Sequence, residues 1–278
     1  MEGKGAGCSL GGRARVVAGQ IMDLTADSRR IDLWCTYISD IGDDALWPRY
    51  DALLTAEERA RQARFRFARD QRRYLVTRAL VRTVLSRYAA VRPQDWVFSA
   101  GPRGRPEISA PRPVPALEFN ISHSADLVLL GVTSGRALGI DTESIAAREA
   151  DIEGLDRYFT PEESAVLLSL TPLERRRRFF ELWTLKESYM KARGMGLAIA
   201  LDAFRFELTG EQGLVLHMRP ELGDTPGRWR LWQLVLRADY LAAVCAARGE
   251  GEPRITVREV VPLAREKIVD IAPSRSTG

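Results

Sequence analysis

The chain has 278 residues, of which 45% are hydrophobic, and this is enough for one large domain or two modest ones with a buried core. It contains no apolar run of about 18 residues and no apolar signal-peptide core near its start, so we expect neither a membrane span nor a secreted protein. The formal net charge of +4, with arginine exceeding lysine, suits an acidic partner, but a GC-rich genome explains such an excess equally well.

The three cysteines, Cys8, Cys35 and Cys245, have no spacing typical of a metal site. Cys35 and Cys245 lie in apolar, strand-like runs and should be buried thiols, which favours a reducing, cytoplasmic compartment. Residues 1–30 are rich in glycine, arginine and alanine, and we expect them to form a disordered N-terminal tail.

The first half of the chain combines strand patterns with two helix patterns. One helix should begin at Thr55, because a threonine followed three residues later by Glu58 is the capping-box pattern. A basic helix follows at about residues 69–90, and its broad apolar stripe should enter the core: Leu75, Val76, Leu80, Val81, Val84 and Leu85. Strands are expected at residues 31–38, 96–99, 117–121 and 127–133, with an irregular, proline-rich surface loop at 102–115.

The second half repeats this order. A strand at residues 137–143 precedes a second capping box, Thr160 to Glu163, and a helix at about 175–192. The two capping threonines are 160 − 55 = 105 residues apart, which indicates an internal duplication. Further strands are expected at residues 203–208, 214–218, 228–236, 240–247 and 255–261, and residues 264–278 are expected to be a C-terminal tail.

The fold class predicted from this order is α+β, a pseudo-dimer of two similar halves at residues 31–136 and 137–263. Only a short turn separates the halves. They should therefore pack side by side, with a functional site in the cleft between them.

Four residues carry the strongest chemical signal. Asp141 and Glu143 share one face of a predicted strand, and Glu187 and Lys191 share one face of a predicted helix. Three carboxylates from two elements could hold Mg²⁺, which usually leaves its other positions to water and substrate phosphates. Taken alone, the first pair is better explained as a solvated strand end and the second as a surface ion pair. The interpretation as a metal site therefore depends on the neighbouring sequence motifs.

Four sequence blocks match one family in content, order and spacing: Gly104–Pro106, Phe119–Ser124, Leu138–Glu143, and Trp183–Ser188 with Lys191. With these blocks the chain resembles the Sfp-type 4′-phosphopantetheinyl transferases over roughly residues 30–250. The resemblance implies the two-half α+β fold of that family, with coenzyme A bound between the halves. It also implies transfer of the phosphopantetheine arm of coenzyme A to a serine of an apo acyl or peptidyl carrier protein, releasing adenosine 3′,5′-bisphosphate.

The resemblance further implies roles for the four residues named above. Asp141, Glu143 and Glu187 would bind Mg²⁺, which would grip the pyrophosphate of coenzyme A. Glu187 would also accept the proton of the attacking serine, and Lys191 would contact the α-phosphate and stabilise the leaving bisphosphate. A carboxylate beside a cation is normally a weak base, so positioning must carry much of the rate.

Binding of coenzyme A is implied for six residues: Arg61, Arg73, Arg105, Ser122, His123 and Lys186. Arg105 stands where the family usually has lysine, which keeps the charge. Glu58 stands where some members are basic, so either Arg59 or Arg61 compensates or the grip on the 3′-phosphate is weaker. For the arginines the alternative is a solvated helix face. The run at residues 175–178 could meet an acidic carrier helix or equally be solvated surface.

Two other classes compete with this interpretation. A metal-dependent nuclease would also use carboxylates, a lysine and a basic surface, but the chain lacks a nucleic-acid motif with stacking aromatics. A binding protein with a decayed active site is disfavoured because the expected carboxylates and Lys191 are all present. We expect a monomer with no nucleic-acid or membrane partner; the sequence does not indicate which carrier protein is served.

Overall fold

The computed structural model describes residues 22, 29–101, 103–113, 116–147, 154–237, 239–249 and 251–278. Cys8 and most of the expected N-terminal tail lie outside these residues. The first half contains β1 (Arg30–Tyr37), α1 (Leu46–Asp51), α2 (Ala56–Ala63), α3 (Ala68–Leu85), β2 (Val97–Ala100), β3 (Pro106–Ala110), β4 (Leu117–Ser124) and β5 (Leu127–Ser134). The second contains β6 (Leu138–Ser144), α4 (Leu155–Tyr158), α5 (Pro161–Ser169), α6 (Pro172–Arg193), β7 (Phe204–Thr209), β8 (Gly213–Met218), β9 (Trp229–Leu236) and β10 (Tyr240–Ala247).

The two halves have the same topology, which confirms the predicted α+β pseudo-dimer. In the first half β1 pairs antiparallel with β5, and β5 pairs antiparallel with β4. In the second half β6, β10 and β9 repeat that arrangement. A capped helix, a longer helix and a hairpin (β2–β3 or β7–β8) lie between the first strand and the last two in each half.

Both predicted capping boxes are formed. The hydroxyl of Thr55 accepts a hydrogen bond from the Glu58 backbone N–H, and the Glu58 carboxylate accepts one from the Thr55 backbone N–H. Thr160 and Glu163 repeat the exchange at the start of α5. These reciprocal bonds satisfy backbone groups that the first turn of a helix leaves unpaired, so they fix where α2 and α5 begin.

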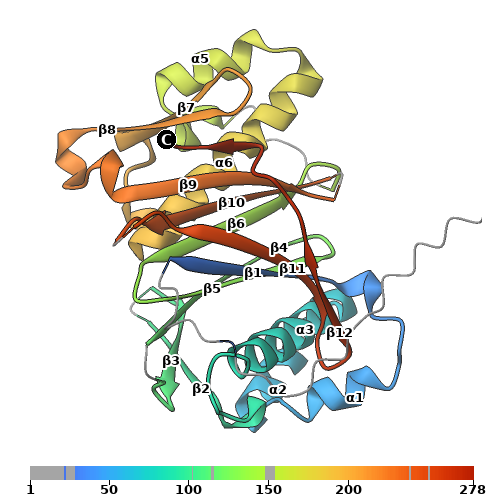
Figure 1. Cartoon of the computed structure of the whole chain (residues 1–278). Helices are drawn as coiled ribbons and strands as arrows, with labels where there is room; N and C mark the ends of the chain where they lie inside the picture. The colour runs from blue at the N-terminus through green and yellow to red at the C-terminus, as the bar shows by residue number, and fades with distance from the viewer. Residues whose placement is uncertain are drawn as a thin grey trace, which may run out of the picture.

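Three apolar clusters separate four layers of structure (Figure 1). The first lies between α3 and the first sheet and contains the whole predicted stripe of α3. The second lies between the second sheet and α6, and the third lies between the two sheets, built from side chains of β1, β5, β6, β9 and β10. Because side chains alternate across each strand, each central strand contributes to two of these clusters. Cys35 and Cys245 are buried in them, as predicted.

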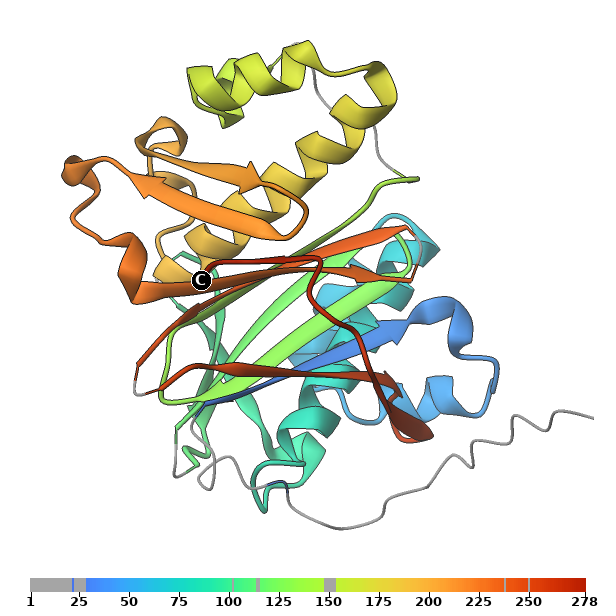
Figure 2. The same ribbon diagram turned by 45° about the horizontal axis from the view of Figure 1, so that its top comes forward.

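Two expectations were wrong. Residues 106–110, inside the stretch expected to be irregular, form β3 and pair with β2. Residues 264–278 are not a tail, because they carry β12 (Arg265–Val269) and β13 (Arg275–Ser276). After β10 the chain returns to the first sheet, where β11 (Arg254–Val261), expected within the second half, runs parallel to β1 and β12 forms the sheet edge. The chain then crosses back, and β13 joins the second sheet (Figure 2).

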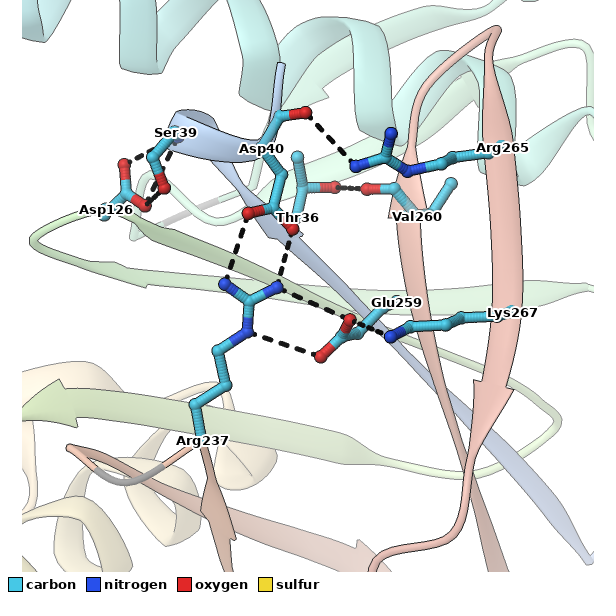
Figure 3. A network of polar contacts seen from close by, with 9 residues as sticks. All are labelled: Thr36, Ser39, Asp40, Asp126, Arg237, Glu259, Val260, Arg265 and Lys267. Atoms are coloured by element: carbon cyan, nitrogen blue, oxygen red, sulfur yellow. Dashed lines mark hydrogen bonds and ion pairs between the residues drawn. The ribbon is translucent and has the colours of Figure 1, made fainter. Parts of the chain in front are cut away.

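A polar network ties the two sheets together at one end (Figure 3). Arg237, at the turn after β9, donates to Asp40, just beyond β1, with an N–O distance of 2.6 Å, and to Glu259 of β11 at 3.4 Å. Its guanidinium lies 3.4 Å from the ring centroid of Tyr37. Lys267 of β12 makes a further ion pair with Glu259 at 2.9 Å. Arg237 therefore joins a turn of the second sheet to two strands of the first.

Candidate active site

Strands β4 and β6 lie side by side, although the two belong to different sheets. Instead of backbone pairing, three alternate side chains of β4 each accept a hydrogen bond from a backbone N–H of β6. We call this contact the β4–β6 seam. Its pairs are Asn120 with Ile140 at 2.9 Å, Ser122 with Thr142 at 3.2 Å, and Ser124 with Ser144 at 3.0 Å.

The two serines of the seam also hold the predicted carboxylates of β6. Ser122 Oγ donates to Asp141 Oδ1 at 2.8 Å, and Ser124 Oγ donates to Glu143 Oε2 at 2.7 Å. Both carboxylates are buried. Asp141 Oδ2 is buried and has no hydrogen-bond partner. A buried carboxylate oxygen without a donor is costly, and a bound cation would satisfy it.

Helix α6 approaches β6 closely because residue 139 is glycine. A Cβ atom at this position would lie far inside van der Waals contact with the backbone of Ser188 and Ala192. The close approach places Lys191 over the strand, with its Nζ 2.6 Å from Asp141 Oδ1 and 3.4 Å from Ser122 Oγ. The structure therefore brings Lys191, Asp141 and Ser122 together at the junction of the two halves.

The three predicted metal ligands do not form a closed metal centre in this structure. Within the described ranges, no three His, Cys, Asp or Glu side chains gather closely enough to hold an ion. Glu187 lies on α6 one turn before Lys191 and is partly exposed. This arrangement still suits Mg²⁺, which binds through one or two protein carboxylates and completes its shell with substrate phosphates and water. The hard oxygens of Asp141 and Glu143, and the unpaired Asp141 Oδ2, fit that requirement.

A cavity of about 650 Å³ opens beside this cluster and is lined by both halves. Its walls include four of the residues predicted to bind coenzyme A: Arg61, Arg73, Ser122 and His123. Asp141 and Lys191 lie in the same lining. The cavity thus combines several cations with the buried carboxylate, as a site for a polyphosphate requires.

His123 and Arg73 are neighbours in this cavity. Desolvation by the surrounding protein, followed by the positive charge of Arg73, lowers the pKa of His123 below its ordinary value. The imidazole is therefore neutral near pH 7 and can donate or accept a hydrogen bond. An anion bound beside it would favour its charged form.

Lys186 does not fit the predicted role in binding coenzyme A. Its side chain is fully buried, forms an ion pair with Glu163 at 2.8 Å, and donates to the carbonyl oxygens of Leu201 and Phe204. It is absent from the cavity lining. Lys186 instead fastens α6 to α5 and β7.

Arg105 also points elsewhere. It donates to the Phe119 carbonyl of β4 at 2.9 Å and to the Lys191 carbonyl of α6 at 3.0 Å, so it connects the two halves. It lies outside the cavity lining. In this geometry it holds the backbone that carries Lys191.

Glu58 lies in the cavity wall, and its charge is already balanced. Its carboxylate is buried between Arg78 and Arg82, each at 2.8 Å. No family motif marks Arg78 as part of the site, although its spacing of four from Arg82 places both on one face of α3. Of the two arginines considered as compensation, Arg61 lines the cavity, whereas Arg59 pairs with Asp51 at 3.2 Å. Each arginine at residues 175–178 hydrogen-bonds within the chain, to Glu181 or to backbone carbonyls.

Known proteins share both the sequence and the two-part organisation. The family model described as 4′-phosphopantetheinyl transferase, N-terminal, matches residues 43–134, and that of the 4′-phosphopantetheinyl transferase superfamily matches residues 137–245. The border between them falls at the turn between β5 and β6, where the first half ends. Taken together, fold, cavity and these matches define a two-part phosphopantetheinyl transferase, and the chain belongs to the 4′-phosphopantetheinyl transferase superfamily.

Similar proteins include two named transferases. The 4′-phosphopantetheinyl transferase HetI of Nostoc is 34% identical over 204 residues, which cover 73% of this chain and 82% of HetI. The 4′-phosphopantetheinyl transferase Sfp of Bacillus subtilis is 31% identical over 209 residues, covering 75% of this chain and 89% of Sfp. The holo-acyl-carrier-protein synthase of Thermotoga maritima matches with a TM-score of 0.33 at 18% identity, covering 50% of this chain and 86% of that one.

Proposed function

We propose that this chain transfers the 4′-phosphopantetheine arm of coenzyme A to a serine of an apo acyl or peptidyl carrier protein in a Mg²⁺-dependent reaction. Phosphopantetheinyl transfer follows from the family. The proposal of a Mg²⁺-dependent reaction on carrier proteins rests mainly on one observation. Lys191 contacts Asp141 and Ser122 on the wall of a basic cavity between the halves. No helix in the described part of the chain is long and apolar enough to cross a membrane.

Different cavity residues would bind different parts of the donor substrate, coenzyme A. Arg61, Arg73 and His123 line the cavity and would hold the phosphates of coenzyme A. Asp141 and Glu143 would hold Mg²⁺, with the pyrophosphate of coenzyme A supplying further ligands. The cation would neutralise charge that develops on that pyrophosphate. Glu187, from α6, is the third protein group proposed at this position.

The reaction then needs a proton acceptor and a group that stabilises the leaving oxygen. The carrier serine oxygen attacks the β-phosphorus, its proton passes to Glu187, and the bond to the α-phosphate oxygen breaks. Lys191 would stabilise the charge on the departing adenosine 3′,5′-bisphosphate. Its Nζ lies only 2.6 Å from Asp141 Oδ1, and the side chain lines the cavity.

The direct test is the intact mass of several apo carrier proteins after incubation with this protein, coenzyme A and Mg²⁺. Addition of one phosphopantetheine group, abolished by EDTA, is the expected result and ranks the carriers. Coenzyme A binding without transfer to any carrier would contradict the proposed activity on those carriers. Failure to bind coenzyme A at all would overturn the proposal.

One chain supplies both walls of the cavity, so we propose that the monomer is the active species. Sedimentation velocity at the concentration of the transfer assay should give the mass of a single chain. An obligate dimer at that concentration would contradict this.

A further inference from the structure

Ser124 is buried at the β4–β6 seam, outside the cavity lining, and makes two hydrogen bonds there. Its oxygen accepts from the Ser144 backbone N–H at 3.0 Å, and its hydroxyl donates to Glu143 Oε2 at 2.7 Å. A serine hydroxyl has one hydrogen to donate. The geometry therefore commits that hydrogen to Glu143.

This bond limits where the Glu143 carboxylate can lie. A glutamate side chain has three torsions, and a hydrogen bond to a fixed group narrows the rotamers that it can adopt. Ser124 belongs to the first half and Glu143 to the second, so their bond fixes the carboxylate relative to β4, whose residues Ser122 and His123 line the cavity. Ser122 holds Asp141 in the same way two residues earlier.

We propose that Ser124 is a positioning residue that sets the geometry of Glu143 for binding the cation. This inference rests on the proposed function, in which Glu143 is a ligand of Mg²⁺. Groups that hydrogen-bond to metal ligands typically change metal affinity by about 10–100-fold when they are removed. Nothing in the sequence motif separates Ser124 from an ordinary turn residue, since it ends β4.

The seam supplies a matched control. Asn120 makes the same kind of bond between the halves, accepting from the Ile140 N–H at 2.9 Å, and it is also buried. That bond goes to the backbone of β6 and to neither of its carboxylates. Asn120→Ala therefore weakens the seam without releasing Glu143, whereas Ser124→Ala does both. Ser124→Thr keeps the hydroxyl.

The experiment measures binding of Mn²⁺, a paramagnetic substitute for Mg²⁺, by the electron paramagnetic resonance signal of free Mn²⁺ in the presence of coenzyme A. Thermal unfolding is recorded for each variant. We expect Ser124→Ala to weaken Mn²⁺ binding by about 10–100-fold and Ser124→Thr to restore most of it. Asn120→Ala should lower the melting temperature and leave Mn²⁺ affinity within about twofold of wild type.

The outcomes separate the possible failures. Unchanged Mn²⁺ affinity in a folded Ser124→Ala variant would overturn the positioning role. Equal losses of Mn²⁺ affinity in Ser124→Ala and Asn120→Ala would also overturn it, because the effect would then belong to the seam as a whole. If Ser124→Ala does not fold, Ser124→Val replaces it in the experiment. A folded Ser124→Val variant that binds Mn²⁺ as tightly as wild type would also overturn the positioning role. Wild-type protein that binds coenzyme A but no Mn²⁺ would instead refute the metal site on which the inference rests.

Discussion

Two lysines on α6, Lys186 and Lys191, have opposite roles because they point to opposite sides of the helix. Five residues of an α-helix correspond to about 140° of rotation beyond a full turn. Lys186 is therefore directed into the second half, where Glu163 and two backbone carbonyls surround it. Lys191 is directed over β6, where Asp141 and Ser122 meet it. Lys186 is therefore enclosed within the second half, whereas Lys191 lines the cavity.

Lys186→Met should destabilise the protein without changing its affinity for coenzyme A. The substitution leaves the Glu163 carboxylate buried without its cation, and removing one partner of a buried pair costs about 3–5 kcal/mol. Glu163 keeps hydrogen bonds from Thr160 and Phe206, so the loss should fall near the lower limit. Urea unfolding gives the stability, and calorimetry on the folded protein gives the affinity for coenzyme A. Normal stability with lost affinity would return Lys186 to the predicted binding role.

Glu187→Gln tests the proposed proton acceptor with little change to the fold. The amide has nearly the same shape as the carboxylate but cannot take up the serine proton, so transfer should fall by about 10²–10⁴-fold. Glu187 is partly exposed, and we expect the melting temperature to change by no more than about 2 °C. Rates come from the mass assay on a responsive carrier. Turnover close to that of wild type would show that another group accepts the proton.

At the scale of elements, β6 and α6 form the site because Gly139 lets the helix lie against the strand. Other features of this pair follow from the sequence alone: the two-residue spacing of Asp141 and Glu143, and the four-residue spacing of Glu187 and Lys191. The sequence does not show how near the two elements come. That distance depends on a single missing Cβ, and a glycine inside a strand is just as typical of a bulge or a tight bend.

Gly139→Ala should therefore disrupt both fold and site. The added methyl group would overlap backbone atoms of α6, which cannot rotate away as a side chain could. We expect a loss of about 3 kcal/mol or more, at the upper end for overpacked cores, and a strong drop in transfer by any protein that folds. Gly42→Ala is the control, because its Cβ would meet no heavy atom within 4 Å. Equal melting temperatures for the two variants would refute the close-packing argument.

The internal duplication could be predicted because each half has its own local signals. The capping boxes at Thr55 and Thr160, and the alternating apolar runs that follow them, are short-range features that a sequence shows directly. The roles of Lys186 and Arg105 could not be predicted in this way. Their partners, Glu163 and the carbonyls of Phe119 and Lys191, come from elements whose relative placement is set only by tertiary packing.

At the scale of the whole molecule, the C-terminal segment joins the two sheets by backbone pairing. Strand β11 pairs along β1, and β13 then pairs with β9 of the other sheet. The residues of β12 are largely exposed and lack the apolar alternation of a typical strand, which is why the sequence predicts a tail there. They are held instead by backbone pairing to β11, so pairing to a neighbour outweighs the local sequence preference.

The Arg237 network should make the stability of the contact between the two sheets depend on pH in the acid range. Hydrogen bonds from Arg237 are the main reason that the pKa of Asp40 lies below its ordinary value. Partial burial alone would raise the pKa of Glu259, but hydrogen bonds from Lys267 and Arg237 reverse this and lower it. Because both carboxylates bind protons less tightly in the folded protein, the network stabilises the fold above their ordinary pKa values. That stabilisation is lost as the pH falls through the depressed values.

Arg237→Gln should therefore flatten the acid limb of the stability curve. Arg237 is partly exposed and solvent screens its charge, so we expect a cost of only about 0.5–1 kcal/mol at pH 7, shrinking towards zero between about pH 5 and pH 3. Urea unfolding at a series of pH values measures this, and high salt should reduce the difference. Arg219→Gln, which breaks the exposed pair with Asp202, is the control and should leave the curve unchanged. A difference from wild type that stays constant from pH 7 to pH 3 would show that the contact of Arg237 with Tyr37, which does not depend on the carboxylates, holds the two sheets together at this end.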